Sequence, residues 1–84
     1  MARKRKAIPA VVRRAIAERG DGSCRYCGKP GDIVWYGRQV WFEYEIDHVV
    51  PVDLDGPNTP ENLVLACRLC NRRKANKPVE VWRR

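Results

Sequence analysis

Four cysteines form two pairs of the kind that binds a metal ion. They are spaced as Cys24-x-x-Cys27 and Cys67-x-x-Cys70, and 39 residues lie between the pairs. A tight turn lets both thiolates of a pair reach one ion at ~2.3 Å, and two pairs complete a tetrahedron around Zn²⁺. No secretory signal favours disulfides, and no βαβ pattern favours a thioredoxin-like redox pair. The spacing predicts one structural zinc site that is closed to substrate.

A second group of polar residues surrounds the only histidine. His48 follows Asp47 at the end of an aromatic run, Asn62 precedes an apolar run, and Asn71 directly follows the last cysteine. Taken singly, each has an ordinary structural explanation as a hydrogen-bonded, turn or capping residue. Neighbours in a strand point to opposite faces. Asp47 and His48 can therefore serve one site only if the strand ends or bends there, which the nearby Pro51 favours.

The chain is short enough that one domain is expected. At 84 residues it buries a small fraction of its surface, and zinc binding can add on the order of 10 kcal/mol of folding free energy. Residues 1–7 are basic and lack periodicity, so we expect a flexible tail followed by a single domain over 8–84. A helix is predicted over 9–19, where Pro9 suits the first turn and Gly20 suits a left-handed stop.

The strands that position these residues are expected to be short. Aromatic and β-branched residues over 33–36 and 40–46 predict a hairpin. We expect its aromatic side chains to pack in the core and against the neighbouring strand, with base-stacking platforms as the alternative. Residues 62–66 read as a short apolar strand, and the basic segment 72–76 reads as a helix.

The charge is unevenly distributed. The net charge is +7, made up of +6 over residues 1–19, −5 over 20–67 and +6 over 68–84. Basic ends favour a polyanion through counterion release, whereas the acidic centre suggests that a cation separates carboxylates from phosphates. The longest apolar run has five residues, 63–67, far shorter than a membrane span. We therefore expect a soluble cytoplasmic protein that binds nucleic acid and no membrane.

Three stretches resemble the HNH endonucleases, the ββα-metal (His-Me finger) nucleases of bacteria and phages. They are Glu45-Ile46-Asp47-His48-Val49-Val50-Pro51, Glu61-Asn62-Leu63-Val64 and Cys67-Arg68-Leu69-Cys70-Asn71-Arg72-Arg73-Lys74. The resemblance spans about residues 24–77. It implies a small α+β fold with a ββα-metal core at about 43–77, a β-hairpin, short flanking helices and zinc-binding pairs at 24–27 and 67–70.

The resemblance also implies roles for the polar residues. His48 would be the general base that activates water, and Asp47 and Asn71 would hold a catalytic divalent ion. Asn62 would hold the loop and orient His48. Because Asn71 stands where many members carry a histidine, we expect Mg²⁺ or Mn²⁺ rather than Zn²⁺ or Ni²⁺. Phosphate contacts are expected from five basic residues: Arg68, Arg72, Arg73, Lys74 and Lys77.

The resulting hypothesis is a metal-dependent DNA endonuclease that contacts mainly phosphates. One site per chain predicts nicking, with weak sequence specificity. The resemblance makes a phage terminase or another nucleic-acid-processing protein an expected class of partner, and it leaves the oligomeric state open. Two alternatives stay open: a non-catalytic zinc-ribbon module that binds nucleic acid, and a degenerate HNH fold that serves as an accessory in phage packaging.

Overall fold

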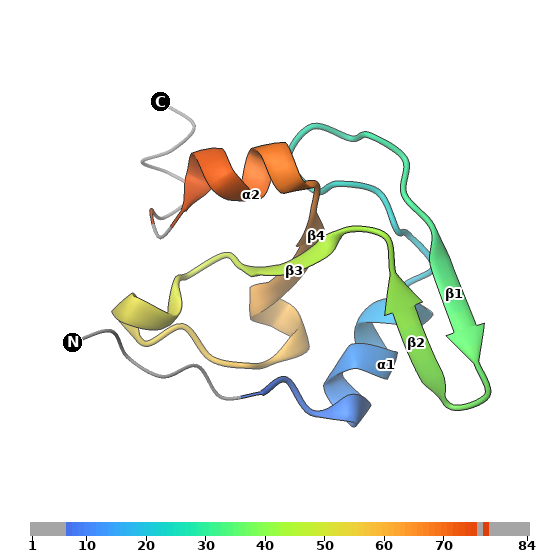
Figure 1. Cartoon of the computed structure of the whole chain (residues 1–84). Coiled ribbons are helices and arrows are strands. Elements are labelled where there is room, and N and C mark those ends of the chain that lie inside the picture. Colours follow the sequence, from blue (N-terminus) through green and yellow to red (C-terminus); the bar gives the residue numbers. More distant parts are fainter. Residues whose placement is uncertain (1–6, 76, 78–84) are drawn as a thin grey trace.

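The computed structural model describes residues 7–75 and residue 77, which form a small α+β fold (Figure 1). The elements follow the order α1 (Ala10–Glu18), β1 (Ile33–Tyr36), β2 (Gln39–Phe42), β3 (Glu45–His48), β4 (Leu63–Ala66) and α2 (Arg68–Lys74), with 3-10 turns at Val52–Leu54 and Pro60–Asn62. The strands make two antiparallel pairs, β1-β2 and β3-β4. The predicted fold class is confirmed, whereas the predicted tail over 1–7 lies outside the described residues except for Ala7. No helix in the described part of the chain is long and apolar enough to cross a membrane.

The aromatic segment predicted as one strand over 40–46 is divided between the two sheets. Its first half lies in β2 and pairs with β1, whereas its second half lies in β3 and pairs with β4. The Glu43 amide donates to the Asp32 carbonyl at 2.9 Å, one step beyond the β1-β2 ladder. The chain then bends at Glu43 and Tyr44. The single-strand prediction is therefore wrong, because the two halves have different hydrogen-bonding partners.

The hydrophobic core lies between α1, β2 and β4. It is formed by Ile16, Ala17, Val40, Phe42, Leu63 and Leu65. Helix α1 is one residue shorter at each end than predicted, and Gly20 has the expected positive φ of 76°. Arg19 follows the helix, and its guanidinium donates to the carbonyls of Leu63 and Pro60. This arginine connects α1 to the start of β4.

The aromatic side chains of the β1-β2 hairpin are only partly in the core. Strand β2 alternates, with Val40 and Phe42 buried and its other two residues exposed. Trp35, Tyr36 and Trp41 are 45%, 66% and 50% exposed. The expectation of core packing was correct for Phe42 and wrong for these three. Tyr36 and Trp41 remain in solvent because they lie on the sheet face opposite the core cluster, whereas Trp35 pairs with Val40 on the core face but lies outside the cluster.

Strands β3 and β4 and helix α2 form a ββα unit. Every residue of β4 is buried, and the register places Asp47 opposite Val64 and His48 opposite Leu63. Cys67 is the N-cap of α2, which therefore begins directly after β4 and packs against β3 (Figure 1). The helix predicted over 72–76 thus begins four residues earlier, at Arg68. This earlier start puts the last cysteine in the first turn of the helix.

Candidate active site and metal centre

The four cysteines meet at one point, between the turn that holds Cys24 and Cys27 (the first knuckle) and the start of α2. Their sulfur atoms all lie within 4.8 Å of one another, and the Cys27 and Cys67 sulfurs are 3.8 Å apart. Four sulfurs at ~2.3 Å from a tetrahedral zinc ion would be separated by about 3.8 Å. The amide of Arg25 donates to the Leu65 carbonyl at 2.8 Å and ties the knuckle to β4. The donor set and its geometry fit a structural zinc ion, as the spacing predicted.

The ionisation of the thiols also favours a bound cation. Burial opposes ionisation of Cys24, but hydrogen bonds from the backbone amides of Cys67, Cys27 and Tyr26 lower its thiol pKa to about 6. Burial, together with hydrogen bonds to the other three sulfurs, raises the pKa of Cys70 to about 12. Without a metal, Cys24 would therefore ionise readily while Cys70 would keep its proton. A divalent ion removes that difference.

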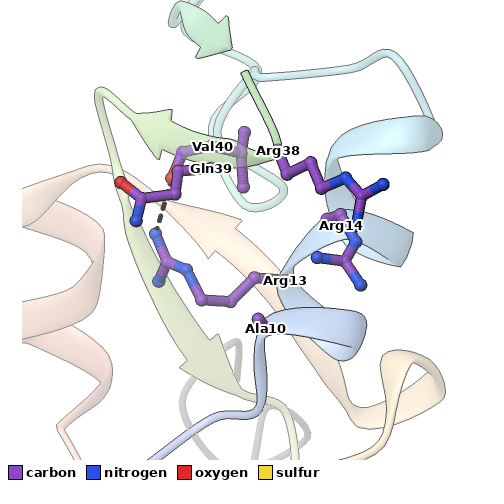
Figure 2. Close-up of a pocket in the computed structure, with 6 residues that line it drawn as sticks. All are labelled: Ala10, Arg13, Arg14, Arg38, Gln39 and Val40. Carbon is purple, nitrogen blue, oxygen red and sulfur yellow. Dashed lines mark hydrogen bonds between the residues drawn. The ribbon is translucent and has the colours of Figure 1, made fainter. Parts of the chain in front are cut away.

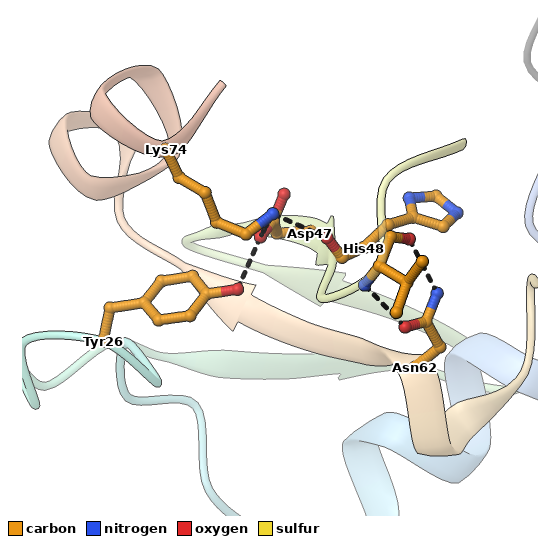
Figure 3. Close-up of polar contacts among 6 residues, drawn as sticks. Tyr26, Asp47, His48, Asn62 and Lys74 are labelled. Carbon is orange, nitrogen blue, oxygen red and sulfur yellow. Dashed lines mark hydrogen bonds and ion pairs between the residues drawn. The ribbon is translucent and has the colours of Figure 1, made fainter. Parts of the chain in front are cut away.

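Asp47 is buried between the first knuckle and α2 (Figure 3). Its Oδ2 accepts a hydrogen bond of 2.6 Å from the Tyr26 hydroxyl and lies 3.2 Å from the Lys74 ammonium. The same ammonium donates to the His48 carbonyl at 2.8 Å. Lys74 has no exposed surface and Asp47 is 7% exposed. The carboxylate that was predicted to bind a metal ion thus has a cationic partner within the chain.

His48 is the last residue of β3 and directly follows Asp47, so the strand ends at this pair. Its imidazole is 6% exposed, and Nε2 lies 2.6 Å from Oδ1 of Asn58. An amide oxygen only accepts, so this contact assigns the proton to Nε2 and leaves the Nδ1 lone pair available. Asn58 lies in the loop between β3 and β4 and was not singled out from the sequence.

Asn62 holds the loop that follows His48. Its Oδ1 accepts from the Val50 amide at 2.8 Å, and its Nδ2 donates to the carbonyls of Val50 and Pro57 at 3.1 and 3.0 Å (Figure 3). The Asn62 carbonyl also accepts from the Val49 amide at 2.9 Å. The side chain therefore links Val50 to Pro57 within the loop, while the contact to the imidazole comes from Asn58, and the role of Asn62 in orienting His48 stays a prediction.

Helix α2 carries Asn71 and most of the predicted phosphate contacts. Asn71 is half-buried and precedes Lys74 by three positions, which puts both on one face of the helix. The side chains of Arg68, Arg72 and Arg73 are exposed, as is that of Lys77 beyond the helix. Lys74 was predicted to lie with them, but its ammonium points into the protein against Asp47. A phosphate contact by Lys74 has no support in this arrangement, and the other four stay predictions.

Sequence reasoning missed three contacts at this site. Tyr26 and Lys74 hold Asp47, and they are separated from it by 21 and 27 residues along the chain. Asn58 contacts the imidazole of His48. The only local signal was that Tyr26 lies inside the first cysteine pair. Any residue in this turn is held close to β4 once the turn is fixed.

These features define a class of small ββα domain with a four-cysteine metal centre and an aspartate–histidine pair at the end of the first strand. The chain belongs to the HNH endonuclease family, whose sequence model matches residues 24–77, well over half of the chain. The matched segment contains both cysteine pairs, the ββα unit and every residue described around Asp47 and His48. No curated protein matches the chain. Family membership indicates nuclease activity in general, with DNA as the substrate.

Proposed function

We propose that this protein is a metal-dependent endonuclease that nicks DNA by hydrolysing phosphodiester bonds, with His48 as the general base. The observation that carries the proposal is the oriented imidazole at the end of β3. His48 is held through Nε2 by Asn58, and the adjacent Asp47 is fixed by two partners. This support lies inside the segment that matches the nuclease family.

The contact from Asn58 to Nε2 supports Nδ1 of His48 as the atom that takes the proton. With its proton on Nε2, the imidazole accepts a proton from water at Nδ1, since a neutral imidazole is a competent general base. The water oxygen then bonds to phosphorus, and the bond from phosphorus to the leaving ester oxygen breaks. Asn58 stabilises the imidazolium that forms, because its amide oxygen continues to accept from Nε2.

Asp47 and Asn71 fit a hard divalent cation. A carboxylate and an amide oxygen are ligands of the type that Mg²⁺ and Mn²⁺ prefer, and neither side chain is a soft donor. A bound ion would supply positive charge to offset the charge that develops on the phosphate and leaving oxygen. We propose Mg²⁺ or Mn²⁺ rather than Zn²⁺ or Ni²⁺ for this role, and Zn²⁺ for the four cysteines.

The basic surface of α2 supports binding through phosphates. Arg68, Arg72 and Arg73 are exposed on the helix that packs beside β3, and arginine recognises phosphate oxygens in a bidentate manner. Such contacts position the backbone without reading bases, so we propose weak sequence specificity. A cytoplasmic location in a bacterial or phage-infected cell and a terminase as partner are proposals that rest on the family alone.

One observation favours a second candidate, a zinc-stabilised module that binds nucleic acid without cutting it. The Lys74 ammonium already lies beside Asp47, where the nuclease needs a metal ion. If the lysine keeps that position when DNA binds, the domain contributes affinity and no hydrolysis.

Nicking of supercoiled plasmid separates the two candidates. Wild-type protein with Mg²⁺ or Mn²⁺ is expected to produce open circles, and His48→Ala is expected to lose at least a hundredfold in rate while keeping its zinc content and its affinity for DNA. Lys29→Ala is the control, because it removes an exposed charge that has no part in the proposed site. Binding without nicking by the wild type would support the module. Equal nicking by wild type and His48→Ala would refute the role of His48, and highest activity in Zn²⁺ or Ni²⁺ would refute the metal assignment.

A further inference from the structure

A hollow lined by three arginines lies away from the ββα unit. It has a volume of about 380 Å³ and lies between the start of α1 and the turn of the β1-β2 hairpin (Figure 2). Its lining residues are Ala10, Arg13, Arg14, Arg38, Gln39 and Val40. The lining thus contains three cations and no carboxylate. None of these residues belongs to the segments that carry the cysteines, the Asp47–His48 pair or α2.

Arg13 is a fixed part of the wall. Its guanidinium donates to the Val40 carbonyl at 3.0 Å and lies over the Phe42 ring, 5.2 Å from the centroid. These contacts hold one positive charge at the junction of α1 and β2. They also make Arg13 a structural residue, because its loss would disturb the contact between helix and sheet.

Arg14 and Arg38 extend into the hollow from two different elements. Arg14 comes from α1, and Arg38 comes from the turn between β1 and β2, with their side chains directed to the same side (Figure 2). Like charges brought together from separate elements repel one another, and an anion bound between them relieves that repulsion. Guanidinium groups bind phosphate oxygens through pairs of parallel hydrogen bonds. The chemistry of the lining therefore selects a phosphate group.

The surrounding surface favours a large ligand over a free ion. Arg38 and Gln39 are exposed and Arg14 is half-buried, so an extended ligand can reach the hollow from solvent. The hollow opens to solvent, whereas a site for a small molecule encloses most of its ligand.

We propose that Arg14 and Arg38 form a second phosphate-binding site, which takes backbone phosphates of DNA outside the segment that is cut. This site goes beyond the proposed nuclease activity, because it would bind DNA whether or not His48 hydrolyses it. Its contribution is affinity through counterion release. Each phosphate contact changes the slope of log K against log[salt] by about −0.9, which corresponds to about eightfold in affinity at 0.1 M salt.

Binding of a fluorescent DNA duplex without added Mg²⁺ or Mn²⁺ tests the proposal independently of cleavage. The Arg14→Gln/Arg38→Gln variant is expected to bind roughly sixtyfold more weakly at 0.1 M salt and to reduce the magnitude of the salt slope by about 1.8. The matched control is Arg25→Gln/Lys29→Gln, which removes the same charge from two exposed residues of the first knuckle. Zinc content and melting temperature establish that both variants fold.

The control variant distinguishes specific binding of DNA in the hollow from a general effect of net charge on DNA affinity. A large loss in the hollow variant with a small loss in the control supports the site. Equal losses in both variants would overturn it, since only net charge would then matter. An unchanged slope in the hollow variant would also overturn it, as would removal of the difference by millimolar inorganic phosphate at constant ionic strength, which would assign the hollow to a free anion. Absence of nicking by the wild type would sink the nuclease proposal and leave this one standing.

Discussion

A buried ion pair connects α2 to the first strand of the ββα unit, and its removal has a calculable consequence. Lys74 is fully buried, and its ammonium contacts Asp47 Oδ2 at 3.2 Å and the His48 carbonyl at 2.8 Å. Methionine in its place keeps most of the aliphatic stem but removes the charge and both contacts. Breaking one partner of a buried pair costs about 3–5 kcal/mol. We expect Lys74→Met to lower the free energy of unfolding by about 3 kcal/mol.

A double-mutant cycle separates the pair from the packing of the lysine stem. Asp47→Asn leaves the ammonium buried without a counter-charge, so we expect a loss of about 3 kcal/mol here too. The double variant removes both charges and leaves neither unpaired. It should lose no more than about 3 kcal/mol, the loss expected of either single variant, which gives a coupling energy of at least about 3 kcal/mol.

The assay is urea unfolding at a fixed concentration of free Zn²⁺, because a metal that binds only the folded state adds to its stability by mass action. Lys77→Met is the matched control. Lys77 is exposed, so its substitution should change stability by less than about 0.5 kcal/mol. Additive losses in the double variant, or a loss for Lys74→Met no larger than that for Lys77→Met, would refute the buried-pair reasoning.

Three further predictions concern the metals and the loop. Cys70→Ser should abolish zinc binding and cooperative folding, because the ion contributes on the order of 10 kcal/mol; circular dichroism and metal analysis measure this, and a folded zinc-free variant would contradict it. Asn58→Ala should slow nicking at least tenfold with little change in melting temperature. Asn62→Ala should instead destabilise the protein by about 2–3 kcal/mol, because it leaves the backbone polar groups of Val50 without their partner. Equal melting temperatures for the two variants would argue against this division of roles. Lys74→Met should bind Mn²⁺ about tenfold more tightly in titration calorimetry, since it removes a competing cation at Asp47; weaker binding would show that the lysine assists the metal.

Sequence reasoning succeeded where the pattern that it used is local in the chain. The cysteine pairs and the Asp47-His48 dipeptide are local patterns, and local spacing alone constrains which atoms can meet. Gly20 likewise marked the end of α1 because its positive φ is a property of one residue. The boundaries of β2 and β3 could not be predicted in this way. The run over 40–46 has strand propensity throughout, and only pairing with two different strands divides it.

The position of Lys74 could not be predicted from local pattern. In the sequence it is one of several basic residues after the last cysteine, and the pattern assigned all of them to solvent and phosphate. The start of α2 at Arg68 fixes the direction of each side chain, and this register turns Lys74 toward β3. A helix that began only at residue 72 would not have fixed the direction of the Lys74 side chain relative to β3.

The sequence by itself determined the composition of both sites: four thiols for a metal centre, and one imidazole beside one carboxylate for the candidate chemistry. These follow from residue type and short-range spacing, which the covalent chain sets directly. Tertiary structure alone decided which groups orient them, since Tyr26, Asn58 and Lys74 reach Asp47 and His48 across 10 to 27 residues of chain. It also brought Arg14 and Arg38 to one hollow. Contacts of this kind depend on how the sheets and helices pack, and no local pattern encodes that packing.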